Sequence, residues 1–180
     1  SVINPAFTAS YTGGPATSAT ITDNDGNPAL TLSPPFTAGT MPNTYVKTAN
    51  NGSVSFTLSA NKGVVNDTSQ ASYAWRPRCF YGVSSNASGN DEAFIEALAS
   101  SQLQASRSAS LSVNAGSGEY IYYAFPASYG AATFTVGGFE GGFDLVGATI
   151  SVTNAYGVTQ DYRLYRSTNP SLGSTTVVVS

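Results

Sequence analysis

The stretch EYIYYAFPASYG, residues 119–130, decides the fold, because it holds four tyrosines and one phenylalanine within twelve residues. Side chains alternate across a β-strand, so YIYYAF divides into two sets that face opposite sides. Neither set is polar, and a strand with two apolar faces must be covered on both sides. One cover is the core of its own domain, and the other is a helix near 91–103, the first half of the chain, or another chain. The two sets are Tyr120, Tyr122 and Ala124, and Ile121, Tyr123 and Phe125.

The composition points to an all-β protein. The chain has 180 residues, enough for one large domain or two small ones. Asp, Glu, Lys and Arg make up only 9% of the residues, against about 25% in ordinary globular domains. Surface polarity must therefore come from Ser, Thr, Asn and Gly, which suit solvent-facing strands and tight turns better than helices.

Charge and cysteine usage argue against several classes of partner. The net charge is −3 and the seven basic residues are scattered, apart from Arg76 and Arg78, so the chain has no basic stripe for nucleic acid. A single cysteine, Cys79, forms no intrachain disulfide and is expected to be buried as a small apolar residue. No apolar run approaches a membrane span, and the start SVINPAF lacks a signal-peptide pattern. Since it also lacks Met, this start suggests a fragment or a processed product.

The residue types needed for catalysis are nearly absent. There is no histidine, and the ten carboxylates are scattered, so the sequence predicts no catalytic, cofactor or metal site and no enzyme. The best alternative is a glycosidase using Glu140 and Asp144 in GGFEGGFDL, where the glycines more simply make turns. The spacing Asp23-x-Asp25-Gly26 resembles part of a calcium loop but lacks the later acidic ligand, so it predicts a turn.

Alternating runs predict two antiparallel β-sandwich units of immunoglobulin-like type, residues 1–84 and 85–180. In the first unit the clearest strand is VSFTLSA, 54–60. In the second, the hairpin ATISVT–TNAYG–DYRLYR within 148–166 is the best defined. The further predicted strands are ATIT (19–22), ALTL (29–32), QASYAW (70–75), ASLSVN (109–114), YIYYAF (120–125), ATFTV (132–136) and STTVVV (174–179).

One short helix is predicted within residues 90–104. Asn90 can cap it, and acidic residues follow in its first turn. Phe94, Ala97 and Leu98 share a helical stripe that would bury its apolar side.

Five aromatic residues are candidates for contact or assembly. Trp75, the only tryptophan, is expected to anchor the core of the first unit, with a ligand platform as the alternative. An exposed cluster of these rings would instead favour a carbohydrate-binding module. The five are Tyr120, Tyr122, Tyr129, Tyr156 and Trp75.

The second half resembles a family of bacteriophage virion proteins found in tails, tail fibres and appendages. The similar elements are FYGVSS (80–85), EYIYYAFPASYGAATFTV (119–136), SVTNAYGVTQDYRLYRS (151–167) and the closing TTVVVS. They follow one another in the family's order over about 100 residues, from 80 to 180, and depart from it at Phe125, where the family more often has Tyr. The first 75 residues are similar only in their immunoglobulin-like strand pattern. The matching residues are Phe80, Tyr81, Gly82, Tyr120, Ile121, Ala124, Pro126, Gly130, Tyr162, Leu164, Tyr165 and Ser167.

The resemblance implies a non-enzymatic structural part of a virion, such as a tail fibre or baseplate, that acts in assembly and host attachment. It implies no catalytic residues and no cofactors. The expected partners are other virion proteins, further copies of the same chain, and a host surface glycan or receptor, with neither nucleic acid nor membrane insertion. Two alternatives stay open, a carbohydrate-binding module and a capsid decoration protein.

Overall fold

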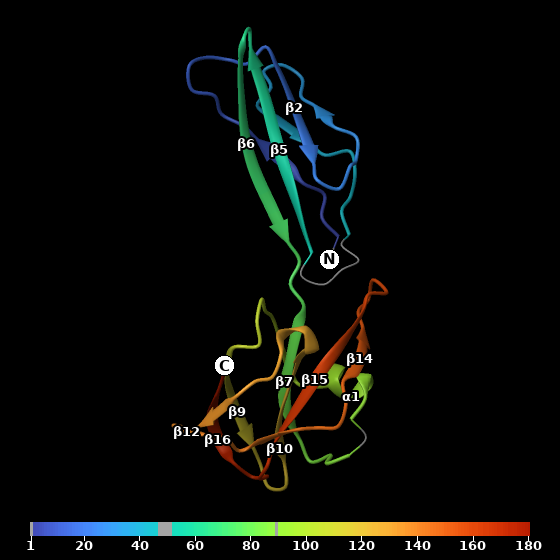
Figure 1. The fold of residues 1–180 in the computed structure, drawn as a ribbon, viewed down its shortest axis with the longest axis vertical. Coiled ribbons are helices and arrows are strands. Elements are labelled where there is room, and N and C mark those ends of the chain that lie inside the picture. Colours follow the sequence, from blue (N-terminus) through green and yellow to red (C-terminus); the bar gives the residue numbers. More distant parts are fainter. Residues whose placement is uncertain (1, 47–51, 89) are drawn as a thin grey trace. The chain divides into compact units, whose positions relative to one another are not determined.

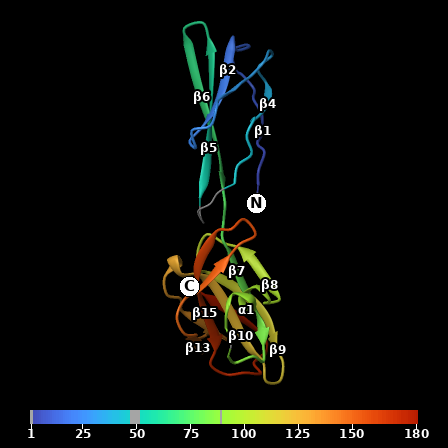
Figure 2. The same cartoon turned by 90° about the vertical axis from the view of Figure 1, so that its right-hand side faces the viewer.

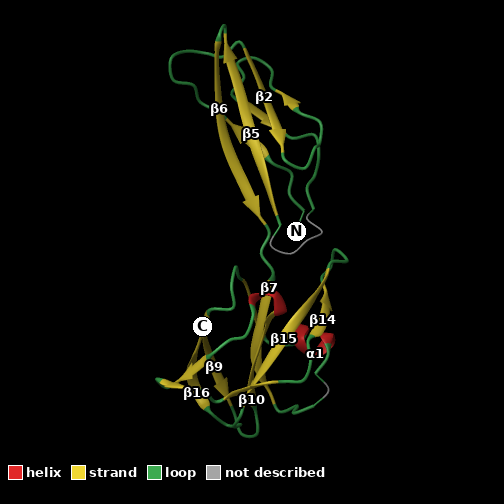
Figure 3. Ribbon diagram, in the orientation of Figure 1, coloured by secondary structure: helices red, strands yellow, loops and turns green. Residues whose placement is uncertain are grey.

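The computed structural model describes residues 2–46, 52–88 and 90–180, and it confirms the all-β prediction (Figures 1 and 3). Strands account for 51% of the residues and helices for 5%. The chain separates into two compact units, Ser1–Trp75 and Arg76–Ser180, and Figure 2 shows the strands of each from a second direction. The immunoglobulin-like topology of the units stays a prediction.

The first unit consists of a four-stranded antiparallel sheet and a small two-stranded one. The large sheet has the order β3-β2-β5-β6, and the small sheet pairs β1 with β4. The β5–β6 hairpin is tight, since Lys62 lies opposite Val65. The strands are β1 (Ala6–Thr8), β2 (Ser18–Asp23), β3 (Leu30–Thr31), β4 (Ala38–Thr40), β5 (Ser53–Lys62) and β6 (Val65–Ala74).

The core of this unit follows from the alternation in β5. Val54, Phe56 and Ala60 are buried, as their spacing predicts. The ring of Phe56 lies 5.1 Å from that of Phe7 on β1 and 5.1 Å from that of Tyr45. Aromatic contacts therefore join the two sheets across the core.

The second unit has two antiparallel sheets and one short helix. One sheet has the order β13-β15-β10-β7-β8, with β14 also pairing with β15, and the other has the order β12-β11-β16-β9. The elements are β7 (Arg78–Ser84), α1 (Glu92–Glu96), β8 (Ser100–Leu103), β9 (Ala109–Ala115), β10 (Tyr120–Pro126), the 3₁₀ turn η1 (Ala127–Tyr129), β11 (Phe134–Val136), β12 (Phe139–Glu140), β13 (Phe143–Leu145), β14 (Ile150–Thr153), β15 (Thr159–Ser167) and β16 (Gly173–Val179).

The boundary predicted between residues 84 and 85 differs from the boundary in the structure. Strand β7 pairs with β10 on one side and with β8 on the other, so FYGVS belongs to the second unit. The two units meet in sequence at Trp75 and Arg76 instead. The predicted boundary lies too late in the sequence because β7 follows β6 closely, whereas the strands that pair with β7 come later in the chain.

The helix predicted over 90–104 is much shorter, and its last part is a strand. Helix α1 ends at Glu96, and Ser100–Leu103 pairs with β7 as β8. The cap is Asp91 rather than Asn90, because the Asp91 carboxylate accepts the Phe94 N–H at 2.9 Å. Ile95 and Leu98 are buried, whereas Ala97 of the predicted stripe is exposed.

The hairpin β14–β15 forms where the sequence predicts it. Thr153 lies opposite Thr159, and the Asn154 carboxamide accepts the N–H groups of Tyr156 and Val158. Gly157 has φ +76°, a conformation that glycine adopts without strain.

Candidate contact surfaces

The aromatic strand β10 is internal on both faces, as predicted for Tyr122 and Tyr123. Both side chains have an exposed fraction of 0%. Tyr123 belongs to the core between the two sheets, with Leu111 and Val177 of the facing sheet. Tyr122 belongs to a separate core with Ile95 of α1, so the helix is the cover on that side. Strand β10 is the common wall of two cores and not a contact surface.

The hydroxyl groups of these tyrosines are satisfied at the edges of their cores. The Tyr122 hydroxyl donates to the carbonyl of Asn86 at 2.5 Å, and that of Tyr123 donates to the carbonyl of Arg107 at 2.9 Å. Burial raises the pKa of both phenols above the ordinary value. Neutral, hydrogen-bonded phenols of this kind stabilise the fold and do not ionise at neutral pH.

Tyr120 and Tyr129 are partly buried and serve the same unit. The guanidinium carbon of Arg166 lies 4.8 Å from the centre of the Tyr120 ring, a cation–π contact that covers one ring face. The Tyr129 hydroxyl donates to the carbonyl of Gln104 at 2.9 Å. Both side chains therefore make contacts within the second unit.

Tyr156 and Trp75 do not join the other candidates. Tyr156 is 49% exposed in the β14–β15 turn. Trp75 belongs to the first unit, where it packs partly buried against the core, as an anchor would. Its ring centre lies 4.8 Å from that of Tyr73 at an interplanar angle of 68°, so the two rings do not form one flat platform. The five predicted aromatics therefore form no single cluster within either unit.

The candidate carboxylates lie in different sheets. Glu140 of β12 lies opposite Thr135, whereas Asp144 of β13 lies opposite Arg166. Both side chains are exposed. Within residues 2–46, 52–88 and 90–180, no three His, Cys, Asp or Glu side chains gather in a way that could hold a metal ion. No helix in these ranges has the length and apolar character of a membrane span.

The carboxylate of Asp23 organises the turn that the sequence predicts there. It accepts the N–H of Asp25 at 2.8 Å, the N–H of Asn27 at 3.2 Å and the hydroxyl of Tyr45 at 2.6 Å. Burial raises the pKa of Asp23, but the donors on Tyr45, Asn27 and Asp25 outweigh it and hold the pKa below its ordinary value. The oxygens of this carboxylate thus accept hydrogen bonds from residues of the same unit.

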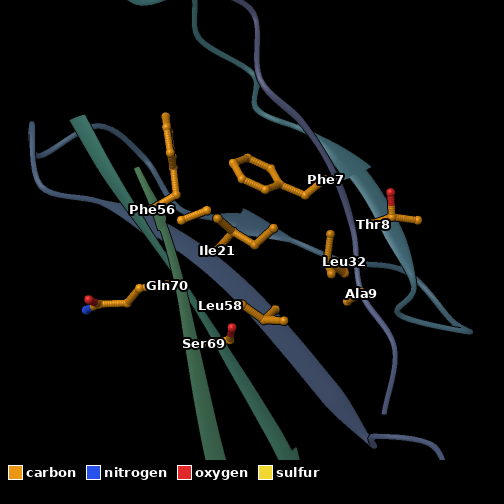
Figure 4. A pocket seen from close by; sticks show the side chains of 10 residues that line it. Phe7, Thr8, Ala9, Ile21, Leu32, Phe56, Leu58, Ser69 and Gln70 are labelled. Atoms are coloured by element: carbon orange, nitrogen blue, oxygen red, sulfur yellow. The ribbon is translucent and has the colours of Figure 1, made fainter. Parts of the chain in front are cut away.

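Sequence reasoning missed the outer edge of the first unit. All ten residues of β6 are exposed, and among the residues that the structure describes β6 pairs only with β5. Beside it lies a recess of about 110 Å³, which Ser69 and Ala71 of β6 help to line (Figure 4). The one feature of the sequence that could have indicated this edge is the low charge of VNDTSQASYA, whose single charged residue is Asp67. The other lining side chains are mostly apolar and include Phe7, Ile21, Leu32, Phe56 and Leu58.

A second exposed feature is the tip of the β11–β12 hairpin. Phe139 is 81% exposed, and Gly138 before it has φ +87°. Leu172 and Val136 line a shallow hollow together with Phe139. A single exposed aromatic of this kind is a contact residue at most, because its neighbours are largely glycine.

No family model, curated protein or solved structure matches the chain.

Proposed function

We propose that the chain is a non-enzymatic contact module of a bacteriophage virion, part of a tail fibre, baseplate or other appendage, that acts in assembly and host attachment. The observation that carries the proposal is the division between the inside and the outside of the molecule. Rings that could bind a ligand are used as core, as in Tyr122 and Tyr123. Backbone edges and uncharged side chains remain outside, as in β6.

Such a surface suits permanent contacts between proteins better than chemistry. An open strand edge offers N–H and C=O groups to another strand, which gives affinity without charged side chains. The assignment to a virion rests on the resemblance over residues 80–180. The fold is compatible with this resemblance, because the similar segments FYGVS, YIYYAFP and DYRLYRS form the adjacent strands β7, β10 and β15 of one sheet.

The proposal is tested on intact particles. Particles purified from the producing bacterium are analysed by quantitative mass spectrometry for this chain, and antibody against the chain locates it by gold labelling. We expect several copies per particle, on the tail or an appendage. A chain absent from the particles would refute the proposal, and labelling over the whole head would favour the capsid decoration alternative.

The carbohydrate-binding alternative now rests mainly on Tyr156, which is exposed, and less on Trp75, which packs partly buried against the core of the first unit. It predicts glycan binding on an array that Tyr156→Ala or Trp75→Ala abolishes. Binding that both substitutions leave unchanged would refute that alternative.

A further inference from the structure

The register of the first sheet shows which backbone groups of β6 point away from that sheet. The N–H of Asn24 donates to the carbonyl of Ser55, so odd-numbered residues of β5 bond to β2. The N–H of Trp75 donates to the carbonyl of Gly52, so odd-numbered residues of β6 bond to β5. The even-numbered residues must then direct their N–H and C=O groups away from the sheet. These residues are Asn66, Thr68, Gln70, Ser72 and Ala74.

The two faces of this edge differ in character. Ala71 lies opposite Phe56 and Tyr73 opposite Val54, so the odd-numbered side chains share the face of the core. The even-numbered side chains are small or amide-bearing and share the opposite face. Natural edge strands are usually protected by lysine, proline, a bulge or a covering loop. β6 has neither lysine nor proline, and its pairing with β5 runs without a break from Val65 to Ala74.

We infer that the partner of this edge is the β6 strand of a second copy, paired antiparallel across a two-fold axis. Opposite residues in an antiparallel pair point to the same face. A two-fold axis through any one residue of β6 also pairs even-numbered residues with even-numbered ones, so the outward groups of two identical edges can bond to each other. With Gln70 on the axis, Thr68 lies opposite Ser72, and Asn66 lies opposite Ala74. The two four-stranded sheets then continue as one.

A second copy brings no clash of like charges in this register. The register is chosen because Gln70 is the middle one of the five outward residues, so that all five are paired when it lies on the axis. Asp67 is the only charged residue of β6. With Gln70 on the axis, Asp67 lies opposite Tyr73 of the other copy, so no carboxylate faces another carboxylate. Like charges directly opposite one another would destabilise the pair. Ser69 and Ala71 of the two copies lie opposite each other beside the apolar recess and can pack closely because both are small.

Asp67 also restrains this edge. Its carboxylate accepts the N–H of Thr68 at 2.9 Å, which is one of the outward donors. Pairing must release that N–H to the carbonyl of Ser72 in the second copy. Asp67→Ala, which removes the competing acceptor, is therefore expected to tighten the association.

The association is expected to be weak for the isolated chain. Stable complexes bury about 1,200–2,000 Å² in total, and a single strand edge provides less than that. Many weak edges held at high local concentration in an assembly still pair effectively. This inference concerns how copies associate, and it stands or falls independently of where the chain is located on a particle.

The first test is sedimentation of the full chain over a wide range of concentration. We expect a monomer–dimer equilibrium that Ser72→Pro abolishes, because proline removes an outward N–H without breaking the β5–β6 ladder. Ser72→Ala is the matched control, because it keeps that N–H and should dimerise like the wild type. Thermal unfolding shows that both variants are folded. A chain that stays monomeric at the highest concentration, or a proline variant that still dimerises, would overturn the inference.

The second test is the register. Gln70→Cys places a thiol opposite its own copy at a Cα separation of about 5.5 Å, within the range of about 4.4–6.8 Å that a disulfide spans. In the same register two cysteines at position 68 are displaced by about 13 Å along the strands, at about 3.3 Å per residue. Cys79 is buried and does not interfere. We expect rapid dimer disulfides for Gln70→Cys and slow ones for Thr68→Cys, and equal rates would overturn the register.

Discussion

Replacing Tyr123 with alanine should destabilise the second unit selectively. The side chain is 0% exposed and packs against Phe125 and Phe134, with ring centres at 5.2 and 6.5 Å. Large-to-small changes of a buried aromatic cost about 3–5 kcal/mol. The substitution also leaves the carbonyl of Arg107 without its donor. Since whole domains are stable by only about 5–15 kcal/mol, this loss is a large part of the total.

Two further variants separate the contributions to this cost. Tyr123→Phe keeps the ring and removes only the hydroxyl, so it isolates the lost hydrogen bond, which is worth about 1–3 kcal/mol when a buried partner is left unsatisfied. Tyr156→Ala removes the same side chain from an exposed turn, and surface changes of this kind stay within about 0.5 kcal/mol.

The assay is urea denaturation observed with two signals. Far-UV circular dichroism reports the strands of both units, whereas fluorescence of Trp75 reports the first unit, whose core it contacts. We expect Tyr123→Ala to move the circular dichroism transition of the second unit to lower urea and to leave the Trp75 transition unchanged. If Tyr123→Ala were no more destabilising than Tyr156→Ala, the assignment of β10 as an internal wall would be wrong.

Three further predictions concern single side chains. The lowered pKa of Asp23 contributes stability that is present above the unfolded pKa of about 4 and is lost as pH falls through the folded pKa. The difference in melting temperature between wild type and Asp23→Ala, followed by Trp75 fluorescence, should therefore shrink on acidification. A difference that stays constant with pH would contradict the hydrogen bonds assigned to Asp23. Burial raises the pKa of the Cys79 thiol to about 11, so iodoacetamide should modify it at neutral pH only after denaturation, and rapid labelling of the folded chain would contradict its burial. A Cβ on Gly82 would lie 2.9 Å from the backbone nitrogen of Ala99. Gly82→Ala should therefore destabilise the second unit by about 1–3 kcal/mol in the same urea assay, and an unchanged transition would contradict this close approach.

The sequence predicted the strands that have a two-residue period and missed features that depend on distant partners. The alternation of Val54, Phe56 and Ala60 was sufficient to place β5, because burial on one face leaves a local signature. SSQL at 100–103 has no such signature. It becomes a strand because β7 presents a free edge to it, a tertiary effect that local propensity does not encode.

The candidate site was predicted less well than the fold, for a related reason. Aromatic residues serve cores and ligand platforms equally well, so their number in β10 did not decide between them. Tyr120 shows the difficulty. Its alternation with Tyr122 is plain, but the cover over its ring comes from Arg166 on β15. Only the pairing of β10 with β15 brings that guanidinium near.

Strands β10 and β6 show when side-chain periodicity identifies a strand and when it does not. A strand buried on both faces is recognisable, because it lacks polar residues altogether, as YIYYAF does. A strand exposed on both faces resembles an ordinary loop-rich segment, since Asn66, Ser69 and Gln70 would suit either. What distinguishes β6 is its backbone, whose outward N–H and C=O groups depend on register and not on side-chain type. Contact surfaces made from strand edges therefore leave almost no trace in composition, and the edge that we propose to pair with a second copy is the one with the plainest sequence.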